Sequence, residues 1–179
     1  MVIGIDISQL AYRNIGVSNY LENLVSKLIE NDNHEFVFFF SSLRREVPIS
    51  IKKLVDSNRN ITLKRFRIPP LVLHLLWNKL HLAPLENFVG NVDVFITSDW
   101  TEPPAKKALK ATILYDLIVY KYPEETDDKI VAVQEEKLKW VKKESDIIFC
   151  ISEATKKDAE DILSLDSKKL KVIYPGSIL

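Results

Sequence analysis

Gly16 and Ser18 are the first residues in the chain whose types and positions point to chemistry. They lie in residues 14–24, NIGVSNYLENL, between a short apolar run and a run with helical spacing. The start of a helix carries unpaired N–H groups and partial positive charge, so it can bind a phosphate. Glycine lets the anion approach the backbone, and the Ser18 hydroxyl adds a hydrogen bond or caps the helix. The alternative is that Gly16 only makes the turn, because the loop matches neither the dinucleotide fingerprint nor the Walker motif.

A second group of polar and aromatic residues follows the apolar run 92–98, VDVFITS. It consists of Ser98, Asp99, Trp100 and Glu102. Sugars have apolar faces and hydroxyl edges, so an aromatic ring beside polar groups suits sugar recognition. A tryptophan in a loop equally fits a lid on the core, and the residues alone leave both interpretations open.

The histidines and the cysteine point less clearly to chemistry. His74 and His81 are seven residues apart and share a helix face, but helical metal ligands more often lie three or four apart. No carboxylate completes a ligand set, so we expect core or partner contacts and no metal. Cys150 lies in an apolar strand and is expected to be inert.

Strand-like and helical runs alternate along the chain and must position these residues. Strands are predicted at 2–7, 35–41, 60–66, 92–98, 111–116, 146–152 and 171–175, and helices at 17–28, 48–57, 71–84, 124–145 and 153–164. This pattern predicts an α/β, Rossmann-like, doubly wound fold, with a mainly parallel sheet of about seven strands and helices on both faces. Ligands of such sheets bind at the carboxyl ends of the strands, here the loops 7–17, 97–104, 116–124 and 152–154.

Composition limits the classes of protein that remain. The chain has 179 residues, of which 46% are hydrophobic, which suits one domain. Lys and Arg number 25 and Asp and Glu 25, so a nucleic-acid partner is not expected. A single cysteine fits a reducing compartment, the start MVIGID carries no secretory signal, and no apolar run is long enough to span a membrane. We therefore expect a cytoplasmic protein.

Four segments, in order along the chain, resemble a known family. They are GVSNYLENLVSKL, LWNKLHLAP with VDVFITSDWTEPP, ATILYDLIVYKYPEE, and SDIIFCISEATKKDAEDIL with KVIYPG. Together they resemble the N-terminal domain of the family four glycosyltransferases, the retaining nucleotide-sugar enzymes of the GT-B fold. The resemblance implies two Rossmann-like domains around a cleft, of which residues 1–179 are the single acceptor-side domain. The C-terminal domain, which binds the nucleotide sugar, is absent from this chain.

The resemblance implies roles for individual residues near the first helix. Gly16 matches the glycine that lies against the donor diphosphate, although Ile15 stands where the family often has a second glycine. Ser18 is expected to assist it. Asn19 is expected to touch the acceptor, whereas Tyr20 belongs to the apolar face of the helix.

Two further motifs carry the expected catalytic and acceptor residues. Tyr115 and Asp116 match the catalytic His-Asp of the family, with tyrosine in place of histidine. A tyrosine hydroxyl can hydrogen-bond, but with a reference pKa of about 10 it is a poor base near neutrality. Asp116 could instead only close its loop. Ser152 and Glu153 match the Ser-Glu that faces the acceptor, and Ser152 could equally cap the next helix.

The resemblance also implies partners. The co-substrate is a nucleotide diphosphate sugar and no metal cofactor is expected; the acceptor is a sugar or a lipid-linked alcohol. The donor domain is expected in cis or in trans, and this chain alone is expected to be an inactive part of a hexosyltransferase. Alternatives are a stand-alone nucleotide- or phosphate-binding module and a non-catalytic subunit of a split enzyme.

Lysine-rich stretches raise a further alternative. They lie at 106–110, 137–143 and 168–171, and such stretches are usually solvated faces. Together with the apolar stretch 69–84 they could instead meet an anionic membrane that carries a lipid acceptor. The protein would then lie peripherally at the inner face of the membrane.

Overall fold

Seven parallel strands form one sheet at the centre of the computed structural model, which describes residues 1–12, 16–30, 33–97 and 99–176. All six pairings are parallel, and the spatial order is β3-β2-β1-β4-β5-β6-β7. The strands are β1 (Val2–Asp6), β2 (Glu35–Ser41), β3 (Ile61–Phe66), β4 (Val94–Thr97), β5 (Leu109–Leu114), β6 (Ile147–Cys150) and β7 (Leu170–Val172). The predicted doubly wound sheet is confirmed.

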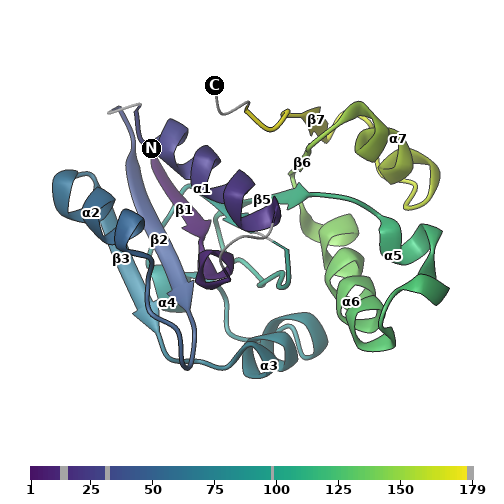
Figure 1. The fold of residues 1–179 in the computed structure, drawn as a ribbon, viewed down its shortest axis with the longest axis horizontal. Coiled ribbons are helices and arrows are strands. Elements are labelled where there is room, and N and C mark those ends of the chain that lie inside the picture. Colours follow the sequence, from purple (N-terminus) through teal and green to yellow (C-terminus); the bar gives the residue numbers. More distant parts are fainter. Residues whose placement is uncertain (13–15, 31–32, 98, 177–179) are drawn as a thin grey trace.

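Helices connect the strands (Figure 1). The α-helices are α1 (Gly16–Leu28), α2 (Ile49–Ser57), α3 (Pro70–Leu73), α4 (Glu86–Val89), α5 (Ile118–Lys121), α6 (Asp128–Glu144) and α7 (Glu153–Asp161). A π-helix, η2 (His74–Lys79), continues α3, and two 3₁₀ turns are η1 (Ser8–Ala11) and η3 (Pro123–Glu125). The sequence patterns did not predict α4, α5, η1 and η3, because single turns are too short to show a period.

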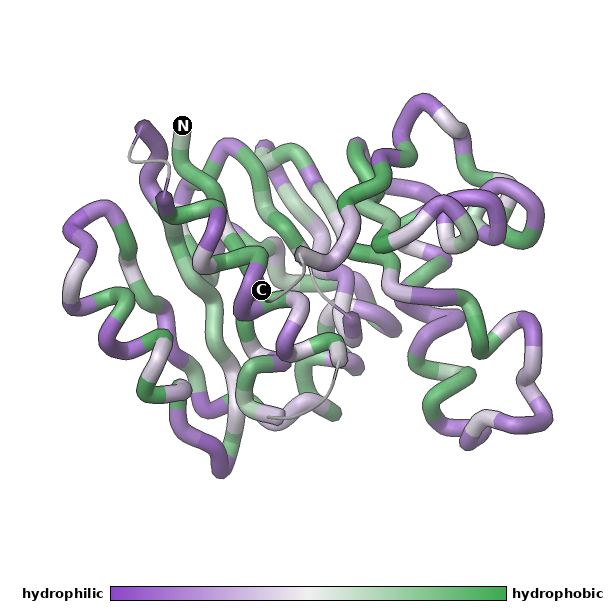
Figure 2. Tube along the Cα trace, turned by 45° about the horizontal axis from the view of Figure 1, so that its top comes forward, coloured by the Kyte–Doolittle hydropathy of each residue, from purple (hydrophilic) through white to green (hydrophobic). Residues whose placement is uncertain are grey.

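The alternation of side chains along each strand divides the core into two faces. Phe36, Phe38 and Phe40 of β2 pack with α1 and α2 on one face. Val37 and Phe39 point to the other face, where α3, η2 and α4 cover them. Further along this second face, α6 and α7 pack over β5 and β6. Green apolar segments accordingly run along the strands through the middle of the molecule (Figure 2).

The central pair of strands requires a glycine at its closest approach. A Cβ on Gly4 of β1 would lie 2.5 Å from Cδ2 of Phe95 on β4, so only a residue without a side chain fits there. The Phe95 ring fills the space and is 1% exposed. This contact joins the two strands whose carboxyl ends form the candidate site.

The stretch 71–84 differs from its prediction as one helix ended by Pro84. The α3–η2 helix ends at Lys79, since His81 (φ 51°) and Ala83 (φ 58°) adopt left-handed backbone conformations. The Trp77 indole N–H donates to the Ala83 carbonyl over 3.0 Å and holds this turn under the helix end. The tertiary contact of one buried ring therefore ended the helix before the proline.

The inward face of α6 is part apolar and part charged. Leu138 and Val141 are buried, whereas Ile130 is 40% exposed. Lys137, a charged residue, is buried instead. The reason lies in the site beneath this helix.

Candidate acceptor cavity

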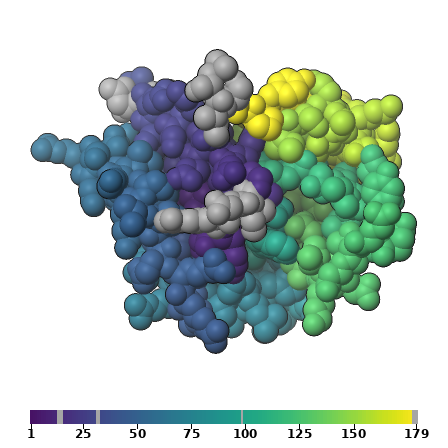
Figure 3. Space-filling model, viewed as in Figure 1, coloured from purple at the N-terminus to yellow at the C-terminus, as the bar shows by residue number. Residues whose placement is uncertain are grey.

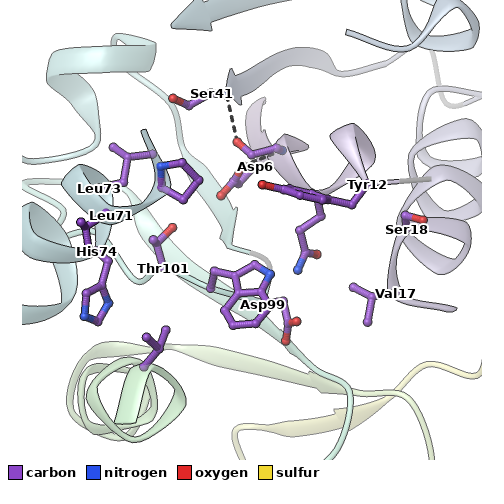
Figure 4. A pocket seen from close by; sticks show the side chains of 15 residues that line it. Asp6, Tyr12, Val17, Ser18, Ser41, Leu71, Leu73, His74, Asp99 and Thr101 are labelled. Carbon is purple, nitrogen blue, oxygen red and sulfur yellow. Dashed lines mark hydrogen bonds between the residues drawn. The ribbon is translucent and has the colours of Figure 1, made fainter. Parts of the chain in front are cut away.

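A cavity of about 480 Å³ lies at the carboxyl ends of β1 and β4 (Figure 4). The two strands are neighbours in the sheet, and the connections that follow β1 and precede β4 run in opposite directions along it. This is the switch point at which doubly wound sheets bind ligands. Its lining residues are Asp6, Ser8, Gln9, Tyr12, Val17, Ser18, Ser41, Pro70, Leu71, Leu73, His74, Asp99, Trp100, Thr101 and Val133.

Two carboxylates project into the cavity from the two strand ends (Figure 4). Asp6 ends β1, and its Oδ1 accepts the backbone N–H of Ser8 over 2.9 Å, which starts the η1 turn. Asp99 follows β4, and the Gln134 amide of α6 donates to its carbonyl over 3.0 Å. Burial raises the pKa of both carboxyl groups above their ordinary values. Both can accept hydrogen bonds from hydroxyl groups of a ligand.

A buried lysine offsets this negative charge. Lys137 of α6 is 2% exposed, and the carboxylates of Asp99, Glu102 and Asp6 act on its charge. Burial lowers the pKa of Lys137, while these three carboxylates raise it. The nearby carboxylates explain why α6 buries Lys137, although the lysine-rich stretch 137–143 was expected to be a solvated face.

Glu102 belongs to this buried group of charges around Lys137 and does not line the cavity. Its side chain is fully buried, accepts the Thr97 hydroxyl over 2.6 Å and lies 3.1 Å from the Lys110 ammonium. Lys110 in turn lies 3.1 Å from Glu144 of α6. These bonds tie the loop after β4 to β5 and α6, which fixes the backbone at Asp99 and Trp100.

Asn78 of η2 holds the same loop from the other side. Its Nδ2 donates to the Trp100 carbonyl over 2.8 Å, and its Oδ1 accepts the Glu102 N–H over 2.9 Å. The Asn78 carbonyl accepts the Trp140 indole N–H of α6 over 2.6 Å. One buried amide therefore positions the loop against two helices.

The remaining walls are aromatic and apolar. Trp100 is 40% exposed, and Leu71 and Leu73 of α3 lie along the opposite wall with His74 (Figure 4). The His74 Nε2 lies 2.9 Å from a Glu136 oxygen of α6, so the ring is oriented from behind. The cavity thus combines carboxylates at its base with apolar walls.

The structure brings three of the predicted site residues together. Ser18, Asp99 and Trp100 all line the cavity. Ser98 lies outside the described residues. Asp6, Gln9 and Tyr12 also line it and were not predicted; the signal for Asp6 was a charged residue closing an apolar strand.

Gly16 and Asn19 lie at the start of α1. Gly16 is exposed at the helix N-terminus, its φ is outside the left-handed region, and a Cβ there would meet no atom of the described residues within 4 Å. The described residues therefore leave room for a side chain at position 16. Asn19 is exposed and turns away from the main cavity toward a shallow depression beside α2.

Tyr115 and Asp116 do not line the cavity. Tyr115 is 7% exposed and packs edge-on against Tyr20, with 5.5 Å between ring centroids. Burial first, then the charge of Asp99, raise its pKa, and its hydroxyl has no hydrogen-bond partner within the described part of the chain. Asp116 is exposed, and its Oδ1 accepts the Ile118 N–H over 3.0 Å, as in the loop-closing alternative.

Ser152 and Glu153 also lie away from the cavity. The Ser152 hydroxyl accepts the Thr155 N–H over 3.0 Å and caps α7, which is the structural alternative for this residue. Glu153 is exposed in the first turn of α7. Of the four loops expected to hold ligand, the two after β1 and β4 form the cavity and those at 116–124 and 152–154 do not.

The other candidate residues have structural partners. His81 stacks on Trp140 at 3.5 Å between ring centroids and bonds to Glu144 over 3.0 Å. Cys150 is buried, which raises the pKa of its thiol to about 11. Within the described ranges, no three His, Cys, Asp or Glu side chains gather closely enough to hold a metal ion, so the expectation of metal-free chemistry stays a prediction.

Comparison with solved structures identifies the class of fold. The chain is similar to apo UGT2 of Phytolacca americana, with a TM-score of 0.56, 11% identity, and coverage of 99% of this chain and 52% of that one. It is also similar to a glycosyltransferase from Rickettsia africae ESF-5, with a TM-score of 0.52, 16% identity, and coverage of 97% and 42%. No protein-family model and no curated protein sequence matches the chain.

The chain therefore has the fold of one half of a GT-B glycosyltransferase. It spans about half the length of the solved proteins that it resembles. The expected class of fold is confirmed, whereas identities of 11% and 16% show the fold alone.

Proposed function

We propose that this chain is the acceptor-side domain of a retaining glycosyltransferase of family four. The complete enzyme would transfer a hexosyl group from a nucleotide diphosphate sugar to an acceptor hydroxyl. One observation carries the proposal: the cavity at the switch point holds two carboxylates, Asp6 and Asp99, beside the Trp100 ring. Carboxylates accept hydrogen bonds from sugar hydroxyls, and an indole packs on the apolar face of a sugar ring.

The donor diphosphate would lie at the start of α1. Cleavage of the glycosidic bond leaves negative charge on the diphosphate, which a helix N-terminus stabilises. Gly16 is exposed there, and the described residues leave room for a side chain at this position. Basic groups of the donor domain would stabilise the remaining negative charge of the diphosphate. The transfer would need no covalent intermediate on this chain.

The proposal gives the catalytic role to a residue of the cavity and not to Tyr115. Tyr115 is buried with a raised pKa, so it is unsuited to accept a proton at neutral pH. Asp99, whose carboxylate borders the cavity, is better placed to orient the acceptor hydroxyl. Tyr115 then has a structural role, as a buried ring that packs beneath the site.

Acceptor binding by this chain tests the proposal. Saturation-transfer NMR with a panel of sugars and alkyl glycosides should detect binders, and Asp99→Asn should weaken binding about ten-fold. Asp161→Asn, at an exposed carboxylate of α7, is the matched control and should leave binding unchanged. Saturable binding of nucleotides without any acceptor binding would instead favour the stand-alone nucleotide-binding module.

A further inference from the structure

Five large apolar side chains are exposed on one short stretch after β3. Leu71, Val72, Leu75, Leu80 and Leu82 are between 47% and 74% exposed. We call these five side chains the leucine surface. In Figure 3 the teal segment that carries them forms the lower edge of the molecule, where Figure 1 labels α3.

Local hydrogen bonds keep the five side chains on one compact segment. Leu71 and Leu75 are one helical turn apart on α3 and η2. The Leu80 N–H donates to the Leu75 carbonyl over 2.9 Å and closes η2, and the Leu82 N–H donates to the Leu76 carbonyl over 2.8 Å, which turns the chain back at the helix end. Leu73 and Trp77 of the same stretch are buried against the sheet. The segment is thus amphipathic, with a second apolar side directed away from the core.

Charge on this part of the chain has one sign. No acidic residue occurs between Asp56 and Glu86. Five basic residues occur in the same interval: Arg59, Lys64, Arg65, Arg67 and Lys79. Arg59 precedes β3 at the end of the strand away from α3, and Arg65 and Lys79 form ion pairs with Glu46 and Glu136. Lys64 and Arg67 lie outside the ion pairs of the described residues, and their charge complements an anionic partner.

We propose that the leucine surface docks on the face of an anionic lipid bilayer. Exposed leucines flanked by arginine and lysine are the composition of segments that lie in the membrane interface. None of the helices in the described ranges combines the length and the apolar character needed to cross a membrane, so docking would be peripheral. Leu71 belongs to both the surface and the cavity wall, so docking brings the cavity to the lipid. Entry of a lipid-linked acceptor into the cavity is a further step that rests on the proposed function.

Co-sedimentation with vesicles tests the docking without any sugar transfer. Vesicles of phosphatidylcholine and phosphatidylglycerol in equal parts should bind the chain, and vesicles of phosphatidylcholine alone should bind it far more weakly. The variant with Leu71→Gln, Leu75→Gln and Leu82→Gln should lose at least about ten-fold in partition coefficient. Arg67→Gln should lose about five-fold at low salt and less at high salt.

A matched variant controls for the general loss of exposed apolar area. Ile49→Gln, Leu109→Gln and Ile162→Gln change three exposed side chains on α2, β5 and α7 and should leave vesicle binding unchanged. Thermal unfolding of both variants checks that they fold. Equal loss in the two variants, or no binding to anionic vesicles by the folded parent, would overturn the proposal. Sedimentation velocity adds a further outcome: self-association removed by the leucine variant alone, with vesicle binding intact, would assign the surface to a second copy of the chain.

The vesicle experiment and the acceptor experiment test different proposals, so failure of the first does not reject the proposed function. The first measures lipid binding at the leucine surface, and the second measures ligand binding at Asp99. Failure of acceptor binding with intact vesicle binding would reject the proposed function and keep the membrane contact.

Discussion

At the scale of residues, the candidate site depends on charges that the protein holds out of water. Asp6, Asp99 and Glu102 surround one buried lysine, Lys137. Glu102 also lies 3.1 Å from the Lys110 ammonium. Burial raises the pKa of Asp6 and Asp99, and the charge of Lys137 opposes that rise. This arrangement costs stability, and it keeps hydrogen-bond acceptors ready in the cavity.

Replacing Asp6 by asparagine should therefore stabilise the chain near neutral pH. The pKa of Asp6 is higher in the folded than in the unfolded chain, so stability falls as the pH rises from the unfolded toward the folded value. Asp6→Asn removes that loss and keeps an oxygen for the Ser8 N–H. We expect a gain of about 1 kcal/mol at pH 7, or about 2–4 °C in thermal midpoint.

The gain should shrink as the pH falls and should vanish only well below about 4, the ordinary pKa of an aspartate, where both states are protonated. Thermal unfolding at several pH values measures it. Asp161→Asn should show no such pH-dependent difference, because that carboxylate is exposed. A lower midpoint for Asp6→Asn at pH 7 would show that the ionised carboxylate is needed to balance Lys137.

At the scale of elements, two short segments position the site: the η1 turn, which the sequence patterns did not predict, and the π-helix η2, which lies within the helix predicted over 71–84. The η1 turn carries Gln9 and Tyr12 follows it, while the π-helix η2 presents Asn78 to the loop after β4. The strands and the longer helices followed from the alternation and the helical period. The turns did not, because their geometry depends on hydrogen bonds to residues far along the chain.

Asn78→Ala should loosen the loop after β4. It leaves the buried Glu102 N–H and the Trp100 carbonyl without their partner, at a cost of about 2–3 kcal/mol. Urea unfolding measures that cost. Asn78→Asp keeps an oxygen for the Glu102 N–H but sets a buried carboxylate against the Trp100 carbonyl, so it should not restore the loss at neutral pH. An alanine variant as stable as the parent would show that Asn78 does not hold this loop.

A pair of glycine variants separates packing from ligand approach. Gly4→Ala places a Cβ 2.5 Å from the Phe95 ring and should cost about 1–3 kcal/mol. Gly16→Ala meets no neighbour among the described residues and should leave stability unchanged or slightly higher, since alanine favours helices. Thermal unfolding compares the two.

The Gly16→Ala variant also tests the proposal that Gly16 lies against the donor diphosphate. In the complete enzyme, Gly16→Ala should raise the KM for the nucleotide sugar, because the methyl group occupies the path of the diphosphate. Equal donor KM values for the Gly16→Ala variant and the parent would remove Gly16 from the donor site.

A second substitution tests the packing explanation for Gly4. Phe95→Leu should restore part of the stability lost in Gly4→Ala, since it removes the crowded ring edge.

At the scale of the whole molecule, the sheet order creates the cavity and the chain corresponds to half of a larger architecture. It covers 52% and 42% of the two solved proteins described above. On the proposed function, the acceptor domain works with a donor domain across a cleft. On the same proposal, the donor domain would determine the donor sugar and the nucleotide.

We therefore expect the native polypeptide to have a mass about twice the 20.6 kDa of this chain. Intact mass spectrometry of the protein from its own cells measures it. A native mass of 20.6 kDa would reject a donor domain in cis. Co-purification would then decide between a separate donor subunit and a binding module.

The sequence by itself determined the architecture, because strand alternation and helical period are local properties of the chain. It also placed Asp99 and Trp100 in a loop, and Ser18 at the start of a helix, at the edge of the sheet where the cavity lies. Only the tertiary structure decided that Tyr115 is buried, that Lys137 is buried beside Asp6 and Asp99, and that the four leucines and Val72 of the leucine surface stay exposed. Burial and charge pairing depend on neighbours from distant parts of the chain, which no local pattern contains.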